Sequence, residues 1–424
     1  MKVLIVGGGG REHAIALKIA QNKEVTKLYA APGNGGMASL CECVPLKATD
    51  VDGVVAFAKE KAIDIVVVAP DDPLCLGMVD MLATAGIPAF GPTGRAAQIE
   101  GSKVFAKNLM KKYGIPTAAY ETFDDCDAAL AYLAGAKYPI VVKADGLALG
   151  KGVLICEDEA AAVEAVKGMM LGGKFGASGA RVVIEEFLTG PEVSVLAFTD
   201  GNVVRPMVSS MDHKRALDGD EGLNTGGMGT IAPNPCYTPE LAERCMNEIF
   251  LPTMRAMNAE GRTFRGCLYF GLMMTPDGPK VIEYNCRFGD PETQVVLPLL
   301  ESDLLTIMRA TANGTLSDVD VRFSSGAACC VVLASGGYPV SYKSGYPIEG
   351  LKEAEKTATV FHAGTKLEAG QIVTAGGRVL GVTATADTLE EAVQKAYAAA
   401  DCIHFTDLHR RGDIGQRALA AQRG

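Results

Sequence analysis

Short, mainly apolar segments alternate with helical stretches through the first hundred residues of this 424-residue chain, and this alternation restricts the possible folds more than any other feature of the sequence. Val3–Val6 is the first such segment, and the pattern returns at Lys27–Ala31, Ile63–Ala69 and Ile87–Phe90. Strands that are buried on both faces and separated by helices form parallel sheets, which bind ligands at the carboxyl ends of their strands. The sequence therefore predicts an α/β domain with a parallel sheet over residues 1–101.

The first turn, Gly7–Gly10, joins a buried strand to a helix predicted to run to about Asn22. Bare N–H groups and the dipole at a helix N-terminus attract anions, so the turn predicts a phosphate site. A dinucleotide cofactor is not expected. The G-x-G-x-x-G motif of dinucleotide-binding folds would have its third glycine at Glu12 or His13, and the second strand ends without an acid that could bind a ribose. A tight turn without any ligand is the alternative.

Composition excludes several classes of function. The net charge is −10 without a run of Lys or Arg, which argues against a nucleic-acid or anionic-membrane partner. The twelve Cys form no C-x-x-C pair and most lie in apolar runs, so we expect buried, reduced thiols in a cytoplasmic protein. The N-terminus enters a strand directly, without a signal peptide, and no apolar run reaches the length of a membrane span. The five His have no ligand-like spacing with Cys, so zinc is not expected.

A glycine-rich hairpin occupies residues 146–152, between strands predicted at Pro139–Asp145 and Val153–Cys156. It is not a Walker loop, because three residues separate its glycines and a strand follows instead of a helix. Lys143 and Lys151 supply positive charge on either side, so we expect the hairpin to close over a polyphosphate. An ordinary mobile hairpin is the alternative.

Two further stretches carry charged residues at predicted strand ends. Strands at Arg181–Leu188 and Val193–Phe198 meet at a joint that holds Glu185, Glu186 and Glu192. Alternation along a strand places only one of the first two on a given face. Met211–Gly229 reads as a long loop, and loops of more than about 12–15 residues in a compact domain are usually functional or disordered. We expect a substrate loop there, although a lone His213 more often has a structural role.

The segment Val281–Glu292, V-I-E-Y-N-C-R-F-G-D-P-E, begins as a strand. Alternation predicts that Ile282 and Tyr284 enter a core while Glu283 and Asn285 share the opposite face. One carboxylate and one amide oxygen suit Mg²⁺, which is typically held by one or two carboxylates and by substrate phosphates. Arg287 adds a planar fork for a carboxylate or phosphate. A surface strand that carries polar residues by chance is the alternative.

Helices are predicted at residues 95–113, 239–261 and 294–313, and buried strands at Gly266–Thr275 and Cys329–Ala334. From Phe323 the sequence shows short β segments and a helix from about Leu389 to Cys402, with few converging acids or bases. We therefore expect a separate α+β cap domain over residues 323–424.

Taken in order, these motifs resemble an ATP-grasp ligase. The motifs are V-V-K-A-D-G-L-A-L-G-K-G-V, I-E-E-F-L-T-G-P-E-V-S, D-H-K-R, N-T-G-G-M-G and E-Y-N-C-R-F-G-D-P-E. With V-G-G-G-G-R-E-H-A and A-P-G-N-G-G before them, the chain is similar from end to end to the glycinamide ribonucleotide synthetase (phosphoribosylamine–glycine ligase) family. The resemblance implies an ATP-grasp fold over residues 102–322, with an ATP lid at about 116–190 and a larger catalytic part at about 191–322, between the N-terminal βα domain and the C-terminal α+β domain.

The resemblance also implies roles for individual residues. Arg287, Lys214 and Asp212 would be catalytic, and Glu283 and Asn285 would bind Mg²⁺ or Mn²⁺. ATP would contact Lys103, Lys143, Gly146, Gly150, Lys151, Gly152, Glu185, Glu186, Phe187, Leu188 and Glu192. The other substrates would contact Gly9, Gly10, Arg11, Glu12, Asn34, Gly35, His213, Asn224, Gly226, Gly227 and Glu292.

The implied reaction joins glycine to 5-phosphoribosylamine through glycyl phosphate, with ATP as co-substrate, in the cytoplasm, in purine biosynthesis. The partners would be these small molecules, and a monomer is expected, with a dimer as the alternative. The chain departs from the family pattern at Met211, at Ala69–Leu74, at Leu223 and at Ile231-Ala232, which affects details of the sugar-side pocket. Another ATP-grasp ligase, a carboxylase that uses bicarbonate, and a non-catalytic nucleotide-binding regulator are the alternatives.

Overall fold

The computed structural model describes residues 1–147, 152–172 and 176–423. Its first hundred residues form a parallel sheet of five strands in the order β3-β2-β1-β4-β5. The strands are Lys2–Gly7 (β1), Lys27–Pro32 (β2), Glu42–Cys43 (β3), Ile65–Val68 (β4) and Ala89–Phe90 (β5). The helices are Gly10–Ile19 (α1), Val51–Glu60 (α2), Asp71–Cys75 (α3), Met78–Thr84 (α4) and Gly94–Gly101 (α5). The predicted parallel sheet is thus confirmed.

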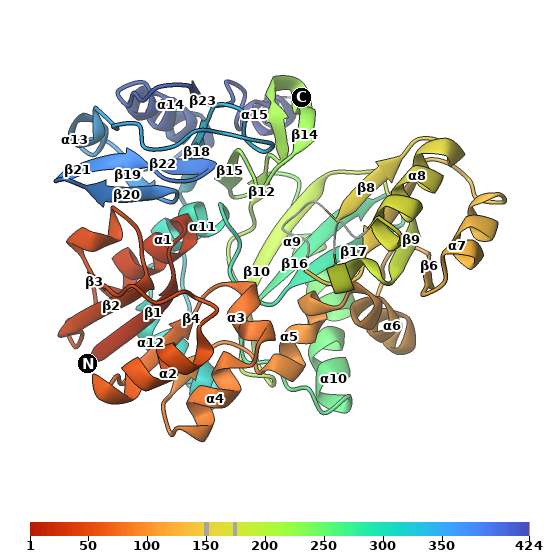
Figure 1. Ribbon diagram of the computed structural model, residues 1–424, viewed down its shortest axis with the longest axis horizontal. Coiled ribbons are helices and arrows are strands. Elements are labelled where there is room, and N and C mark those ends of the chain that lie inside the picture. Colours follow the sequence, from red (N-terminus) through yellow and green to blue (C-terminus); the bar gives the residue numbers. More distant parts are fainter. Residues whose placement is uncertain (148–151, 173–175, 424) are drawn as a thin grey trace.

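A four-stranded antiparallel sheet in the order β11-β10-β16-β17 lies at the centre of the molecule (Figure 1). Its strands are Glu192–Thr199 (β10), Val204–Pro206 (β11), Gly266–Thr275 (β16) and Gly278–Asn285 (β17). The nearby helices are Lys103–Tyr113 (α6), Pro239–Cys245 (α9), Leu251–Ala259 (α10), Thr293–Leu299 (α11) and Leu304–Asn313 (α12), with a π-helical turn at Met246–Phe250. Apolar side chains of this sheet and of the N-terminal sheet pack into shared clusters, so the two sheets have a continuous core.

A smaller antiparallel sheet, in the order β6-β9-β7-β8, projects from the body in yellow tones in Figure 1. It consists of Tyr120–Phe123 (β6), Ile140–Ala144 (β7), Val153–Cys156 (β8) and Val182–Glu186 (β9), with the helices Cys126–Leu133 (α7) and Glu159–Met170 (α8). Its apolar side chains form a separate cluster. A unit with a core of its own can move as a rigid body against the rest.

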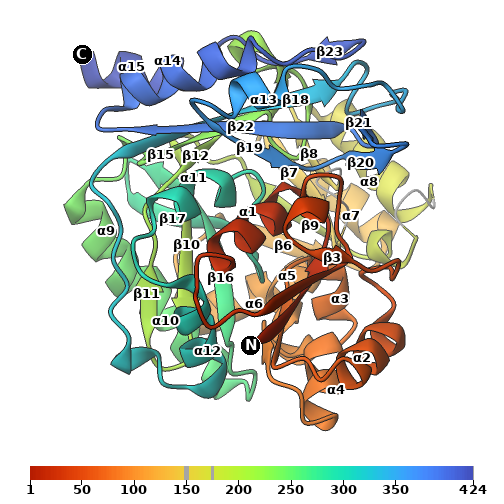
Figure 2. The same cartoon turned by 90° about the vertical axis from the view of Figure 1, so that its left-hand side faces the viewer.

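The C-terminal part forms a layer of its own along one side of the molecule, drawn in blue in both ribbon views (Figure 2). Its sheet has the order β12-β15-β18-β22-β19, and β23 also pairs with β18. The strands are Met211–Asp212 (β12), Gly229–Ala232 (β15), Ala327–Ser335 (β18), Thr359–His362 (β19), Arg378–Ala386 (β22) and Leu408–His409 (β23). Two hairpins, Arg215–Leu217 (β13) with Glu221–Asn224 (β14) and Thr365–Glu368 (β20) with Gln371–Thr374 (β21), and the helices Leu351–Ala354 (α13), Leu389–Ala400 (α14) and Gln416–Arg423 (α15) complete it.

Three sequence-based expectations are wrong in detail. The helix expected over residues 95–113 is broken at Ser102, which is extended (φ −140°) and caps α6 by accepting from the N–H of Phe105. The helix expected over residues 294–313 is likewise broken before Asp303, whose carboxylate caps α12. Short polar side chains that satisfy the first N–H groups of a helix account for both breaks.

The third correction concerns the expected loop at Met211–Gly229. It contains strands β12, β13 and β14, and β15 begins at its last residue and pairs with β18 of the C-terminal sheet. The polar sequence hid these strands, because β12 pairs with β15 and β13 with β14 through backbone hydrogen bonds, while Met211 and Ile231 supply the apolar contacts with the C-terminal core. Residues 211–229 are therefore tied to the C-terminal part of the chain through β15, and we call them the substrate hairpin after the role expected from the sequence.

Candidate active site

A cavity of about 620 Å³ opens where the N-terminal sheet, the central sheet, the small sheet and the substrate hairpin meet. Its lining is strongly charged, with as many acidic as basic side chains among the described residues. The basic ones are Arg11, Lys103, Lys107, Lys143, Lys214, Arg287 and Arg378, and the acidic ones are Asp71, Glu100, Glu185, Asp212, Glu283, Asp290 and Glu292. A cavity of this volume and charge suits ligands that carry both phosphate and amine groups.

Strand β17 supplies the predicted cation ligands. Glu283 and Asn285 both line the cavity. Tyr284 also touches its wall, but its side chain is buried in the core of the central sheet. The expectation that Ile282 enters the core is wrong, since Ile282 also lines the cavity. The reason is a β-bulge: Gly271 pairs with Glu283 and Leu272 with Val281, so Ile282 is an extra residue that disturbs the alternation.

Beside this strand the cavity is lined by a buried cluster of two lysines and one glutamate. The Glu185 carboxylate is 2.6 Å from Lys143 Nζ and 2.7 Å from Lys107 Nζ, and all three side chains are almost fully buried. Burial opposes ionisation of Glu185, but the two ammonium groups hold its pKa below the usual value. Burial lowers the pKa of Lys107 to about 8, against the attraction of Glu185. Glu186 faces the other way and accepts from the N–H of Ala119, as strand alternation requires.

Lys103 stands at the start of α6 and donates from Nζ to the carbonyl oxygen of Gly146 at 2.7 Å. Burial lowers the pKa of Lys103, whereas Glu283 nearby raises it. Gly146 and Gly152 line the cavity at the two ends of the glycine hairpin. Gly150 and Lys151, which were predicted to contact ATP, lie outside the described residues.

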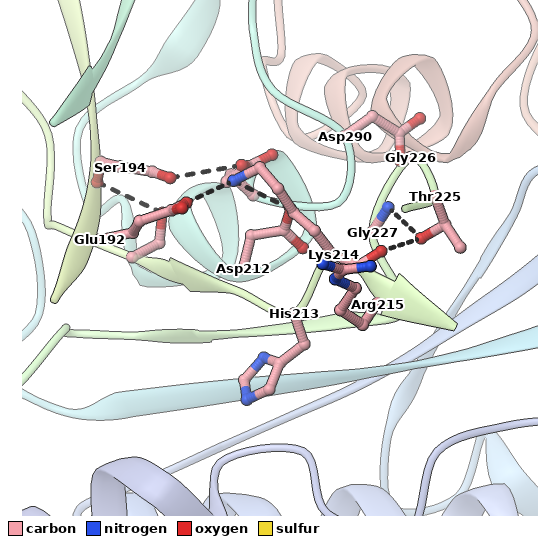
Figure 3. A network of polar contacts seen from close by, with 12 residues as sticks. Glu192, Ser194, Asp212, His213, Lys214, Arg215, Thr225, Gly226, Gly227 and Asp290 are labelled. Atoms are coloured by element: carbon pink, nitrogen blue, oxygen red, sulfur yellow. Dashed lines mark hydrogen bonds and ion pairs between the residues drawn. The ribbon is translucent and has the colours of Figure 1, made fainter. Parts of the chain in front are cut away.

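The substrate hairpin contributes a second charged group (Figure 3). Lys214 Nζ lies 3.0 Å from Glu192 Oε2 and 3.8 Å from Asp212 Oδ2. Burial opposes protonation of Lys214, but Glu192 and Asp212 raise its pKa well above the usual value. Burial raises the pKa of Asp212 to about 7, although Lys214 acts in the opposite direction. Asp212 is thus a carboxyl group that can gain or lose a proton near neutral pH.

His213 points away from this group (Figure 3). Its Nδ1 lies 3.2 Å from the carbonyl oxygen of Gly229, and its Nε2 accepts from the N–H of Gly415 at 3.2 Å. Burial lowers the pKa of His213 to about 4, helped by Arg411. The ring is neutral and engaged on both sides, so it joins the hairpin to the C-terminal part and does not reach the cavity.

The glycine turn before α1 brings one side chain to the cavity. Arg11 lines it and donates from Nη1 to the carbonyl oxygen of Phe288 at 3.0 Å. Glu12 turns back on its own helix, because it accepts from the N–H of Gly9 at 2.6 Å and from Arg11 Nε at 2.7 Å. Asn34 bridges the turn to the C-terminal part, since its Nδ2 donates to the carbonyl oxygens of Gly8 and His362. In the structure, Glu12 and Asn34 thus shape the turn and join it to the C-terminal part.

The structure brings together about half of the residues that the resemblance singled out. Those that line the cavity are Arg11, Lys103, Lys143, Gly146, Gly152, Glu185, Asp212, Lys214, Asn224, Gly226, Glu283, Asn285, Arg287 and Glu292. Those that lie outside its lining are Gly9, Gly10, Glu12, Asn34, Gly35, Glu186, Phe187, Leu188, Glu192, His213 and Gly227.

Several charged residues of the cavity were missed by the sequence analysis. Arg378 reaches it from β22 and donates to the carbonyl oxygens of Gly226 and Asp290, so the C-terminal part does supply a converging base. Glu100 and Lys107 reach it from α5 and α6. A signal for these two existed in the polar residues on otherwise buried helix faces, but nothing local in β22 distinguished Arg378 from a surface residue.

Comparisons with known proteins agree along the whole chain. Residues 1–100 match the N domain of phosphoribosylglycinamide synthetase, residues 101–293 its ATP-grasp (A) domain and residues 328–417 its C domain. The phosphoribosylamine–glycine ligase of Allochromatium vinosum is 51% identical over 427 residues and covers all of both chains. That of Halalkalibacterium halodurans is 50% identical and covers 99% of this chain and 98% of its own.

Solved structures give the same result. The phosphoribosylamine–glycine ligase of Thermotoga maritima has a TM-score of 0.86 at 35% identity and covers 98% of this chain and 100% of its own. The biotin carboxylase domain of 2-oxoglutarate carboxylase from Hydrogenobacter thermophilus has a TM-score of 0.73 over 96% of this chain and 91% of its own. At 18% identity, this second likeness shows the ATP-grasp fold alone.

Proposed function

The chain belongs to the phosphoribosylamine–glycine ligase family of ATP-grasp enzymes, and from this premise we infer that it ligates glycine to 5-phosphoribosylamine. The products are glycinamide ribonucleotide, ADP and phosphate, in a step of purine biosynthesis. One observation carries this proposal. A single cavity collects the phosphate-binding lysines, the candidate cation ligands and the charged substrate hairpin, although these come from distant parts of the chain.

In the first step a carboxylate oxygen of glycine attacks the γ-phosphorus of ATP, and ADP leaves, which gives glycyl phosphate. Phosphoryl transfer of this kind needs positioning and charge neutralisation more than a protein nucleophile. Lys143 and Lys103 stand where they can hold phosphate oxygens, and Glu185 fixes the position of Lys143. Arg287 can hold the glycine carboxylate with its planar fork.

In the second step the amine nitrogen of phosphoribosylamine attacks the acyl carbon, phosphate leaves, and the nitrogen gives up a proton. A pKa of about 7 suits Asp212 to accept that proton near neutral pH. Lys214 lies beside it and can stabilise the charge that develops on the acyl phosphate. We therefore assign catalytic roles to Asp212, Lys214 and Arg287.

The donor set of β17 fits a hard divalent cation. Glu283 and Asn285 offer oxygen atoms from one face of the strand, and no cluster of three His, Cys, Asp or Glu suited to a metal occurs among the described residues. Such a site depends on the phosphate oxygens of a nucleotide to complete it. Mg²⁺ or Mn²⁺ held there would neutralise phosphate charge, and Glu283 and Asn285 would orient the nucleotide through it.

The remaining nucleotide contacts follow the same logic. We propose that the joint between the small and central sheets, residues 185–188, lies against adenine, and that Glu192 holds the ribose hydroxyls. Glu192 is bound to Lys214 in the structure, so the ribose would have to share or replace that partner. The hairpin of residues 146–152 would cover the phosphates.

We place 5-phosphoribosylamine at the glycine turn and the substrate hairpin. Arg11 would bind its phosphate, with backbone groups of Gly9, Gly10 and Gly35 shaping that site, and Asn224, Gly226, Gly227 and Glu292 would surround its sugar. The turn has no room for a side chain at Gly8, because a Cβ there would lie 2.3 Å from the carbonyl oxygen of Gly33.

We propose three functional units: residues 1–101, residues 102–322 with an ATP lid at about 116–190, and residues 323–424. Closure of the lid would exclude water, which would otherwise hydrolyse the acyl phosphate. All twelve Cys are free thiols, which supports a reducing cytoplasmic location. No described helix has the length and apolar character needed to span a membrane. A monomer is our expectation, with a dimer as the alternative to be resolved by solution mass.

The test is phosphate release from ATP and Mg²⁺, measured with glycine alone, with 5-phosphoribosylamine alone and with both. We expect release only when both are present, together with a product that contains glycine and the ribose phosphate. Release that needs neither co-substrate, or that proceeds with bicarbonate in place of glycine, would contradict the proposal.

A further inference from the structure

The carboxylate of Glu100 touches three consecutive residues, namely the last residue of β17 and the two residues after it. Its Oε2 accepts from the N–H of Cys286 at 2.7 Å, and its Oε1 accepts from Arg287 Nη2 at 2.9 Å. Glu100 is almost fully buried near the end of α5, in a different part of the chain from β17. Both oxygens of this carboxylate therefore act as hydrogen-bond acceptors.

The third contact concerns the side-chain amide of Asn285. Its two orientations are not equivalent, because one of them sets the amide oxygen against Glu100 Oε1. In the other orientation Nδ2 donates to Glu100 Oε1 at 2.9 Å and to the carbonyl oxygen of Tyr284 at 3.3 Å. Hydrogen-bond partners are what assign the two ends of an amide, so this second orientation is the one the structure supports.

This orientation determines which atom of the Asn285 amide faces the cavity. With Nδ2 held by Glu100, Oδ1 is the atom that Asn285 presents to a cation, beside Glu283 on the cavity wall. Without Glu100 the amide could turn and present its NH₂ group, which cannot bind a cation. We propose that Glu100 is a positioning residue that fixes Asn285 as an oxygen ligand. This inference rests on the proposed metal role of Glu283 and Asn285.

The same carboxylate couples two parts of the reaction. Glu100 also pairs with Arg287, to which we assign the glycine carboxylate, so one buried group orients a cation ligand and a substrate ligand together. Partners behind metal ligands generally fix ligand orientation in this way, and their mutation typically lowers metal affinity about 10–100-fold.

The test reverses donor and acceptor in the hydrogen bond between residues 100 and 285. Glu100→Gln replaces one acceptor with an NH₂ group of the same size, so Asn285 loses its orientation, and we expect Mn²⁺ affinity in the presence of ADP to fall at least tenfold. In Glu100→Gln/Asn285→Asp the new NH₂ can donate to the new carboxylate, which presents an oxygen in either orientation. The net charge of the site equals that of the wild type, so we expect affinity to return to within a few-fold of the wild-type value.

Bound Mn²⁺ is measured by electron paramagnetic resonance on the full chain with ADP, and ADP binding without metal is measured by calorimetry. The single variant Asn285→Asp controls for the added carboxylate. Its new carboxylate faces Glu100 without a hydrogen bond, so we expect this variant to bind Mn²⁺ less tightly than the double variant. Glu248→Gln, at a partly exposed residue that pairs with Arg244, is the control for a Glu-to-Gln change away from the site.

Wild-type affinity in Glu100→Gln would overturn the inference while leaving the proposed function intact. The inference would also be overturned if the double variant bound Mn²⁺ as weakly as Glu100→Gln, or more weakly than Asn285→Asp alone. Either result would mean that Glu100 only supports the fold. A wild-type protein that binds no Mn²⁺ with ADP would overturn the metal role itself and the inference with it. Neither measurement needs glycine or 5-phosphoribosylamine, so the ligase reaction is tested separately.

Discussion

Two buried histidines join the N-terminal and C-terminal parts of the chain, and they predict a defined loss of stability in acid. His13 on α1 accepts from the N–H of His362 through Nδ1 at 2.8 Å, and the His362 ring contacts Thr365 at 3.0 Å. A Cβ at Gly36 would lie 2.3 Å from the His362 ring, so the contact is tight. Burial lowers the pKa of His13 to about 3, helped by His362, and burial lowers that of His362 to about 4.

The sign follows from proton binding. Below pH 6.5 the unfolded chain takes up a proton at each histidine, whereas the folded chain does not until about pH 3 to 4. The contribution of these two histidines to the free energy of unfolding is therefore fully present above pH 6.5 and is lost as the pH drops. Between pH 7.5 and 5 each histidine costs about 2 kcal/mol, because one pKa unit corresponds to about 1.4 kcal/mol.

We expect His13→Asn to remove about half of this acid sensitivity. The Oδ1 atom of asparagine can accept from the N–H of His362, as Nδ1 does, but it takes up no proton. The free energy of unfolding is measured by urea denaturation at pH 7.5 and 5. The difference between the two pH values should shrink by about 2 kcal/mol relative to wild type.

Comparing differences cancels two confounding effects. Lost packing in the variant affects both pH values equally, and other titrating groups such as Asp212 contribute the same change to both proteins. His404→Asn, at an exposed site, is the matched control and should leave the difference unchanged. An acid loss in His13→Asn equal to that of wild type would refute the reasoning.

Three further predictions follow from the cavity and its supports. Lys143→Ala or Glu283→Ala should each lower turnover by about 10²–10³, on the scale of a lost charge-stabilising contact; near-normal turnover in either would remove that residue from the site. Asp212→Asn should lower turnover at least 100-fold, because the amide cannot accept a proton. It should also raise the free energy of unfolding at pH 8 by up to about 4 kcal/mol, because the buried wild-type carboxyl is forced to ionise as the pH rises through about 7. An active or less stable variant would contradict this. Arg411→Met should lower the free energy of unfolding by about 3 kcal/mol and raise KM for 5-phosphoribosylamine, because buried Arg411 ties Asp220 of the substrate hairpin to the C-terminal segment. Arg417→Met, at an exposed residue that also pairs with Asp220, is the control and should change the free energy of unfolding by less than about 1 kcal/mol.

The residues predicted best from the sequence are those whose side chains are placed by their own strand. Glu283 and Asn285 share a face of β17, and Glu185 and Glu186 point to opposite faces of β9, as period-two alternation requires. Ile282 is the exception, because the bulge that turns it into the cavity depends on how β16 pairs, which no local pattern encodes.

The residues missed are those placed by contacts between distant segments. Arg378 enters the cavity because β22 packs beside the substrate hairpin, and Glu100 does so because α5 ends beside β17. The strands of residues 211–229 were hidden for a related reason: their partners lie in the C-terminal sheet and within a polar hairpin. Sequence patterns report local geometry, whereas these positions are set by tertiary packing.

The balance of charge in the cavity explains how a chain of net charge −10 can bind polyanions. Each main cation has an acidic partner: Lys143 has Glu185, Lys214 has Glu192, Arg287 has Glu100 and Arg378 has Asp290. These acids allow the cations to be buried and hold them in fixed positions before a substrate arrives. Preorganised donors in a site with little water stabilise developing charge without having to reorient, which is what transfer of a phosphoryl group requires. The acids are therefore part of the anion site, and removing any one of them should loosen its cation as well as change the charge.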